Sequence, residues 1–68
     1  MHKDIKKSKE ILIRVEVKEY KEHEYLDVRT MMLNDQDEWR YTKKGVTIGL
    51  DQVDELVEAI QEVMKAQK

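Results

Sequence analysis

The chain has 68 residues, enough for one small domain. Thirteen basic and fifteen acidic residues give a formal net charge of −2, and 40% of the residues are hydrophobic. A chain of this size buries only about 60% of the surface that it exposes when unfolded, so extra stabilisation is usually needed. There is no cysteine, and His2 and His23 lack metal ligands at suitable spacing, so self-association is the expected source of that stabilisation.

The same composition disfavours several classes of function. No apolar run approaches the roughly 18 residues of a membrane span, and no apolar stretch follows the charged start, so we expect an intracellular chain without a membrane partner. The only serine lies in a basic segment, and a glycine-rich phosphate-binding loop is absent. The sequence therefore predicts a protein that is not an enzyme and that uses no cofactor and no metal ion.

The first ten residues are expected to form a basic flexible arm that precedes one domain over residues 11–68. Four lysines and one aspartate occupy residues 1–9, a composition typical of a mobile tail. Such an arm either keeps the chain soluble or contacts phosphate groups through its lysines, and the sequence leaves both interpretations open.

Two strands are predicted in the first half of the domain. Apolar and polar side chains alternate over residues 11–20, which is typical of a half-buried strand. The polar segment 21–24 predicts a hairpin connection, and a second strand follows over residues 25–32. In that strand we expect Leu26 and Val28 to face the core, with the polar residues between them exposed.

Two shorter strands are predicted next. Turn-forming residues at 34–37 lead to a third strand around residues 38–42, and residues 46–48 alternate again as a fourth strand. Gly45 permits a bend or a close approach of two backbones between these strands.

The last part of the chain has the period of an amphipathic helix, over about residues 51–66. Acidic residues lie at its start and lysines at its end, as the helix dipole favours. The apolar stripe of this helix consists of Val53, Leu56, Val57, Ile60, Val63 and Met64. A single helix covers a four-stranded sheet poorly, so we expect the stripe to form the interface of a homodimer. The predicted fold is α+β, with an antiparallel sheet of four strands followed by one C-terminal helix.

Two short segments carry a resemblance to a known family. Tyr-Leu-Asp-Val-Arg-Thr occupies residues 25–30, and Lys-Lys-Gly-Val-Thr-Ile occupies residues 43–48 after an acidic turn. Together with the helix, they resemble the single-stranded-DNA-binding domain of the positive cofactor four (transcriptional coactivator p15) family. The resemblance implies a strongly curved sheet, a dimer formed through helices and sheet edges, and β-ridges that hold single strands of DNA.

The resemblance also implies a nucleic-acid-binding site. Binding without sequence preference requires cations along the phosphates and flat side chains that receive bases. Many family members place a tryptophan where this chain has Met32, whereas its own Trp39 lies seven residues further on, so a base either stacks on Trp39 or contacts Met32. The expected nucleic-acid-binding residues are Arg14, Lys18, Tyr20, Lys21, His23, Arg29, Met32, Trp39, Arg40, Lys43, Lys44 and Gly45, with Tyr25 and Tyr41 as further aromatic candidates.

Together these expectations describe a non-catalytic homodimer that binds single-stranded DNA in replication, recombination, repair or transcription. Replication or transcription proteins would be its further partners. Two other functions remain open. The acidic balance and the missing tryptophan also fit a dimeric protein-interaction module, or a transcription regulator without single-strand binding. A β-ribbon repressor of duplex DNA is the third possibility, although such folds usually have two helices after the ribbon.

Ordinary structural roles compete for several of these residues. Arg29 beside Asp27 fits a cross-strand ion pair, of little energetic value at the surface. Trp39 fits an anchor in a dimer interface, and Lys43 and Lys44 fit a solvated turn. Exposed tyrosines on strands more often pack across a strand pair than bind bases, and His23 fits an exposed surface residue.

Overall fold

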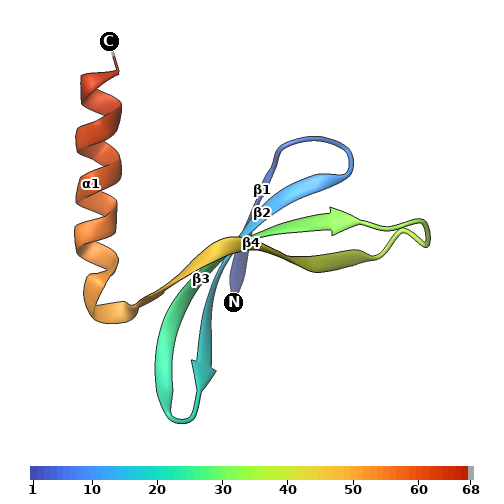
Figure 1. Cartoon of the computed structure of the whole chain (residues 1–68), viewed down its shortest axis with the longest axis horizontal. Coiled ribbons are helices and arrows are strands. Elements are labelled where there is room, and N and C mark those ends of the chain that lie inside the picture. Colours follow the sequence, from blue (N-terminus) through green and yellow to red (C-terminus); the bar gives the residue numbers. More distant parts are fainter. Residues whose placement is uncertain (68) are drawn as a thin grey trace.

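A computed structural model describes residues 1–67, which form one antiparallel sheet followed by a helix (Figure 1). The elements are β1 (His2–Lys6), β2 (Ile11–Tyr20), β3 (His23–Leu33), β4 (Trp39–Gly49), the short 3-10 helix η1 (Leu50–Gln52) and α1 (Val53–Ala66). Strands adjacent in the sheet are adjacent in the sequence, in the order β1-β2-β3-β4. The predicted α+β class, with four antiparallel strands and a C-terminal helix, is confirmed.

The N-terminal segment forms a strand where a flexible arm was expected. β1 pairs with β2 so that Asp4 lies opposite Arg14 and Ile5 lies opposite Ile13. The segment has little apolar alternation of its own, so its extended conformation depends on hydrogen bonds to the edge of β2. The turn between the two strands is closed by backbone bonds from Lys7 and Ser8 to the Ile11 carbonyl, at 2.9 and 3.1 Å.

The two short strands expected near the middle of the chain are one continuous strand, β4. The ladder pairs Met31 with Tyr41 but Arg29 with Gly45, so three residues of β4 lie opposite Thr30 alone. The two extra residues form a β-bulge, which bends the strand and interrupts its alternation. The bulge explains why the sequence pattern of one strand resembles that of two.

A tight turn joins β2 to β3. Tyr20 pairs with His23, so only Lys21 and Glu22 connect the strands. Both have positive φ, 51° and 67°, as a type I′ turn requires. Neither is glycine or asparagine, so the turn is held in a region that L-residues adopt at a cost of about 1 kcal/mol or more each.

The sheet has a polar face and an apolar face. The residues of the polar face include Leu12, Arg14, Glu16, Lys18, Asp27, Arg29, Met31 and Tyr41, and those of the apolar face include Ile13, Val15, Val17, Leu26, Val28, Val46 and Ile48. The buried side chains are Leu12, Asp27 and Met31, all on the polar face. On the apolar face, Val17 is 48% and Val46 50% exposed. The apolar face is therefore not the core of the single chain, and Leu26 and Val28, which were expected to face a core, are only half-buried on it.

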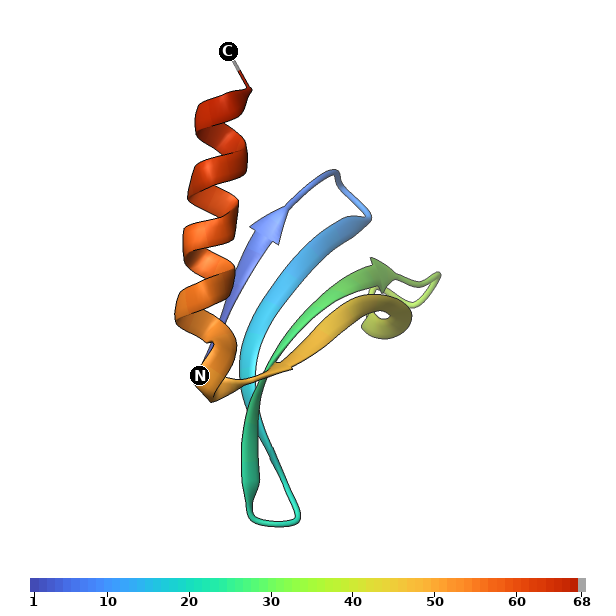
Figure 2. The same cartoon turned by 60° about the vertical axis from the view of Figure 1, so that its left-hand side comes forward.

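The apolar face of the sheet is exposed because α1 stands away from the sheet, as both views show (Figures 1 and 2). Its apolar stripe is correspondingly open, with Ile60 53% and Val63 64% exposed, and only Val53 and Leu56 are half-buried. Within residues 1–67, neither the stripe nor the apolar face of the sheet is covered. No helical segment in this range has the length and apolar character needed to span a bilayer.

Candidate nucleic-acid interface

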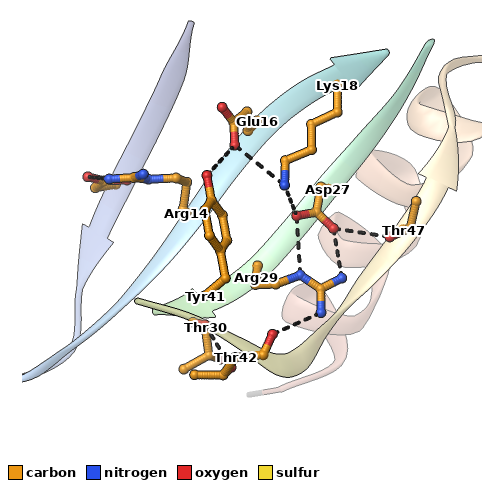
Figure 3. Close-up of polar contacts among 10 residues, drawn as sticks. Arg14, Glu16, Lys18, Asp27, Arg29, Thr30, Tyr41, Thr42 and Thr47 are labelled. Atoms are coloured by element: carbon orange, nitrogen blue, oxygen red, sulfur yellow. Dashed lines mark hydrogen bonds and ion pairs between the residues drawn. The ribbon is translucent and has the colours of Figure 1, made fainter. Parts of the chain in front are cut away.

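A buried carboxylate, Asp27, is the centre of a polar network on the sheet (Figure 3). Asp27 is only 3% exposed, and Arg29 donates two hydrogen bonds to it, at 2.8 and 3.2 Å. The Thr47 hydroxyl donates a third at 3.0 Å, and the Lys18 ammonium lies 3.4 Å away. Burying a carboxylate is tolerated only with such partners, and they hold the pKa of Asp27 below its usual value, chiefly through the Arg29 hydrogen bonds.

A second bidentate pair joins β1 to β2. The Arg14 guanidinium donates to both oxygens of Asp4, at 2.9 and 3.1 Å. These hydrogen bonds lower the pKa of Asp4 and raise the pKa of Arg14. The carboxylate comes from the segment expected to be a mobile arm, so the sequence pattern alone did not reveal that Arg14 is paired.

Lys18 on the polar face and Arg40 on the apolar face are paired as well. The Lys18 ammonium lies 4.3 Å above the centre of the Tyr41 ring, in addition to its contact with Asp27. The Tyr41 hydroxyl in turn donates to Glu16 at 3.3 Å. At the neighbouring turn, Arg40 and Glu38 form an exposed pair at 3.1 Å. Four of the predicted phosphate-binding cations, Arg14, Lys18, Arg29 and Arg40, therefore already have a carboxylate partner.

The bulge in β4 holds two further predicted residues, Lys43 and Lys44. Both side chains are exposed, and neither takes part in an ion pair within residues 1–67. Gly45 follows them at a close backbone approach, where a Cβ atom would lie 2.5 Å from the Val28 carbonyl oxygen. Glycine is therefore required at this position for steric reasons, and the bulge presents two unpaired cations to solvent.

The β2–β3 turn holds another group of predicted residues. Tyr20 is 61% exposed, and the Lys21 ammonium lies 5.3 Å from the centre of its ring. His23, the ladder partner of Tyr20, is also exposed. Lys21 has no carboxylate partner in the described part of the chain. An exposed ring beside an unpaired cation is suited to a base and its phosphate.

Met32 and Trp39 differ in their surroundings. Met32 is exposed and lies opposite Arg40, whereas Trp39 is half-buried and lies opposite Leu33. Because side chains of neighbouring residues alternate across a strand, Trp39 belongs to the polar face and Met32 to the apolar face. Tyr25 is half-buried on the polar face, opposite Lys18.

The structure thus divides the predicted site into two parts. The middle of the polar face carries cations and carboxylates in balance, while the unpaired cations lie at the β2–β3 turn and at the bulge. The residues that compensate and orient these cations were not predicted from the sequence, because no local pattern marks them; they are Asp4, Glu16, Thr42 and Thr47. The ion pair of Arg29 with Asp27 was predicted as an alternative, and the structure shows it, but within one strand face of β3 rather than across strands, and with a buried rather than an exposed carboxylate. Within residues 1–67, no His, Asp and Glu side chains cluster so as to hold a metal ion.

Solved structures and a family model resemble the chain. A bacteriophage T5 homolog of the eukaryotic transcription coactivator PC4, implicated in recombination-dependent DNA replication, superposes with a TM-score of 0.84 at 22% identity, over 98% of this chain and 78% of that one. A PC4 homolog from Burkholderia pseudomallei, in its orthorhombic crystal form, superposes with a TM-score of 0.77 at 26% identity, over 97% of this chain and 85% of that one. No sequence among curated proteins matches significantly. The family model described as Transcriptional Coactivator p15 (PC4) matches residues 6–59, most of the chain, which therefore belongs to this family.

Proposed function

We propose that this protein is a homodimer that binds single-stranded DNA, largely without sequence preference and without catalysis. The observation that carries the proposal is the unpaired Lys21 beside the exposed ring of Tyr20, with Lys43 and Lys44 unpaired at the bulge. Cations bind phosphates and release counterions, and a flat ring receives a base. Membership of the coactivator family supports DNA as the ligand.

A single strand fits this arrangement better than a duplex. A base can stack on Tyr20 only when its own face is uncovered, and duplex bases are covered by their neighbours. A duplex is also stiff, so following a short bent surface costs it several kcal/mol, whereas an unpaired strand bends freely.

Dimer formation is supported by the two uncovered apolar surfaces. The stripe of α1 and the apolar face of the sheet together expose Val17, Val46, Val57, Ile60, Val63 and Met64 by 46% or more. Each buried apolar side chain contributes about 1.5–3 kcal/mol, so pairing two chains through these surfaces supplies the core that one chain lacks.

The dimer is tested at Ile60, which lies on the α1 stripe. Ile60→Asp places a charge in the proposed interface and is expected to convert the protein to monomer, or to unfold it, at micromolar concentration in sedimentation experiments. Glu62→Gln changes an exposed charged residue of the same helix and should leave the dimer intact. A folded monomer of the unaltered protein at that concentration would contradict the proposal.

The proposed biological setting is the handling of exposed strands in DNA replication, recombination or repair, or in transcription. The first setting is supported by what is said of the bacteriophage T5 homolog, and the second by the family's description as a transcriptional coactivator. Replication or transcription proteins are the proposed further partners.

Single-strand binding is tested by fluorescence anisotropy with a labelled oligothymidine over a series of salt concentrations, beside a duplex of equal length. We expect submicromolar binding of the single strand and much weaker binding of the duplex. Replacing Lys43 and Lys44 by alanine should lower the salt slope by about 0.7 for each phosphate that the variant no longer neutralises. The matched variant Lys7→Ala/Lys9→Ala removes the same charge from the β1–β2 turn; an equal loss there would indicate unspecific attraction.

A second function is favoured by the balanced charges on the polar face. Paired carboxylates and cations suit recognition of another protein better than recognition of a polyanion. Indifference of the protein to both oligonucleotides would support a dimeric protein-interaction module, and preference for a particular duplex would support a duplex-DNA regulator.

A further inference from the structure

We propose that Arg29 is a positioning residue, which fixes the bulge that presents Lys43 and Lys44, and that it does not itself neutralise a phosphate. The inference rests on the proposed DNA-binding function and assigns the roles of residues within it. It follows from how the guanidinium is held, from what its remaining arm contacts, and from how the bulge is built (Figure 3).

The charge of Arg29 is already engaged. Two of its N–H groups bind the Asp27 carboxylate at 2.8 and 3.2 Å, in the bidentate geometry that gives strong charge-assisted hydrogen bonds. Asp27 is fixed by further contacts from Thr47 on β4 and Lys18 on β2, so the carboxylate cannot swing away. A phosphate at Arg29 would have to compete with a buried carboxylate that is held by three strands.

The remaining nitrogen of the Arg29 guanidinium contacts the bulge. Its NH1 group donates to the Thr42 carbonyl at 3.2 Å, at the residue that precedes Lys43 and Lys44. The side chain of Thr42 is held by two hydrogen bonds. Its hydroxyl donates to the Thr30 carbonyl at 2.7 Å and accepts from the Lys44 amide at 3.1 Å. These bonds replace the ladder bonds that the two extra residues interrupt.

Gly45 leaves room for the Arg29 guanidinium against the backbone of β4. A Cβ atom at this position would lie 3.1 Å from the Arg29 Cζ atom and 2.9 Å from its Cα atom. The absence of a side chain therefore lets Arg29 lie against the backbone of β4 at the end of the bulge. Asp27, Arg29, Thr42 and Gly45 form one connected support, and the two lysines that follow Thr42 carry the unpaired charge.

The variant Asp27→Asn distinguishes positioning from direct contact by the sign of its effect. If Arg29 only positions the bulge, the variant loses the bidentate pair and binds labelled oligothymidine about fivefold to tenfold more weakly, although it has one negative charge less. If Arg29 contacts phosphate, freeing its guanidinium tightens binding. Asp35→Asn removes the same charge from an exposed turn and should change binding little.

A second variant keeps the test independent of the folding of Asp27→Asn. Arg29→Lys preserves the positive charge but cannot make both the bidentate pair and the bond to Thr42. Positioning predicts a clear loss of affinity, and most of that loss should disappear when Lys43 and Lys44 are already alanine, because the lysines are the groups being positioned. Loss that persists in full in that background would overturn the inference.

Lys21 provides the control for general destabilisation. It lies at the distant β2–β3 turn, so Lys21→Ala should weaken binding by the same factor with and without Arg29→Lys. Coupling of Arg29 to Lys43 and Lys44 but not to Lys21 supports the inference, and equal coupling to both overturns it. If the unaltered protein binds no oligothymidine, the proposed function fails and the inference fails with it; if it binds and Asp27→Asn binds more tightly, only the inference fails.

Discussion

Trp39 and Met32 lie on opposite faces of the sheet, because Trp39 is the ladder partner of Leu33 and Met32 is the partner of Arg40. Trp39 therefore cannot occupy the place of the tryptophan that many family members carry at the position of Met32. The chain has an aromatic side chain on the polar face and a flexible thioether on the apolar face.

This geometry predicts that Met32→Trp and Trp39→Ala affect DNA binding independently. If Met32→Trp adds a base-stacking contact, it tightens oligothymidine binding by about 1–3 kcal/mol, and the gain should be the same with and without Trp39→Ala. Anisotropy titrations of the two single variants and the double variant measure this. A gain that changes when Trp39 is removed would show that both side chains contact one base.

Gly45→Ala is expected to destabilise the protein by about 1–3 kcal/mol, because its Cβ atom would lie 2.5 Å from the backbone oxygen of Val28. Gly49→Ala is the matched control, since its Cβ atom would meet only the movable Asp51 carboxylate, at 2.6 Å. Urea unfolding at one fixed protein concentration compares the two. Equal urea midpoints for the two variants would mean that β3 and β4 can move apart to admit the Cβ atom without a loss of stability.

Glu22→Gly is expected to stabilise the protein, by about 1 kcal/mol or less. Glu22 has a φ of 67°, which glycine adopts without steric strain, although glycine loses more entropy on folding. Glu19→Gly, in the neighbouring strand, lacks positive φ and should destabilise by about 0.5–1 kcal/mol. Thermal and urea unfolding check both, and a loss of stability in Glu22→Gly would indicate that the turn carries no strain.

Stability should fall in acid, in part through Asp27. Its pKa is lowered in the folded chain, chiefly by the hydrogen bonds from Arg29, so its ionised form favours folding. This contribution is present above the unfolded pKa, about 3.9, and is lost as the pH falls through the lower folded pKa. Asp4, whose pKa is lowered by Arg14, acts in the same direction.

The variant Asp27→Asn isolates this effect. Its unfolding free energy should depend less on pH between neutral pH and about pH 3 than that of the unaltered protein. Urea unfolding at several pH values measures the slopes. Identical slopes would show that the folded protein is equally stable with Asp27 protonated and with Asp27 ionised.

The elements with a strong local pattern could be predicted from the sequence. β2 matches its predicted range, since alternation over ten residues leaves few other conformations in which one face is apolar. The apolar stripe of α1 was equally clear from its helical period. The helix itself begins at Val53, after the 3-10 turn, two residues later than the predicted start at residue 51. The double lysine before Gly45 was recognised as a distinct feature, although not as a bulge.

The rest depended on contacts between distant segments. β1 is a strand because the edge of β2 is available to it, and its five residues carry no pattern that predicts this. β4 is one continuous strand only because its pairing with β3 continues on both sides of Thr30. The two extra residues there form a bulge, which hydrogen bonds from Arg29 and Thr42 hold in place. The pairing of Arg14 with Asp4 likewise exists only once β1 is in register.

The sequence by itself determined the class of fold, the family and the residues able to carry positive charge and aromatic rings, because periodicity and residue type are local properties. Only the tertiary structure decided which cations remain unpaired. Arg14 and Arg29 are neutralised by carboxylates, whereas Lys21, Lys43 and Lys44 project from a turn and a bulge where no carboxylate of the described chain reaches them. Charge pairing depends on distances across strands, and those distances are set by register, twist and bulges rather than by spacing along the chain.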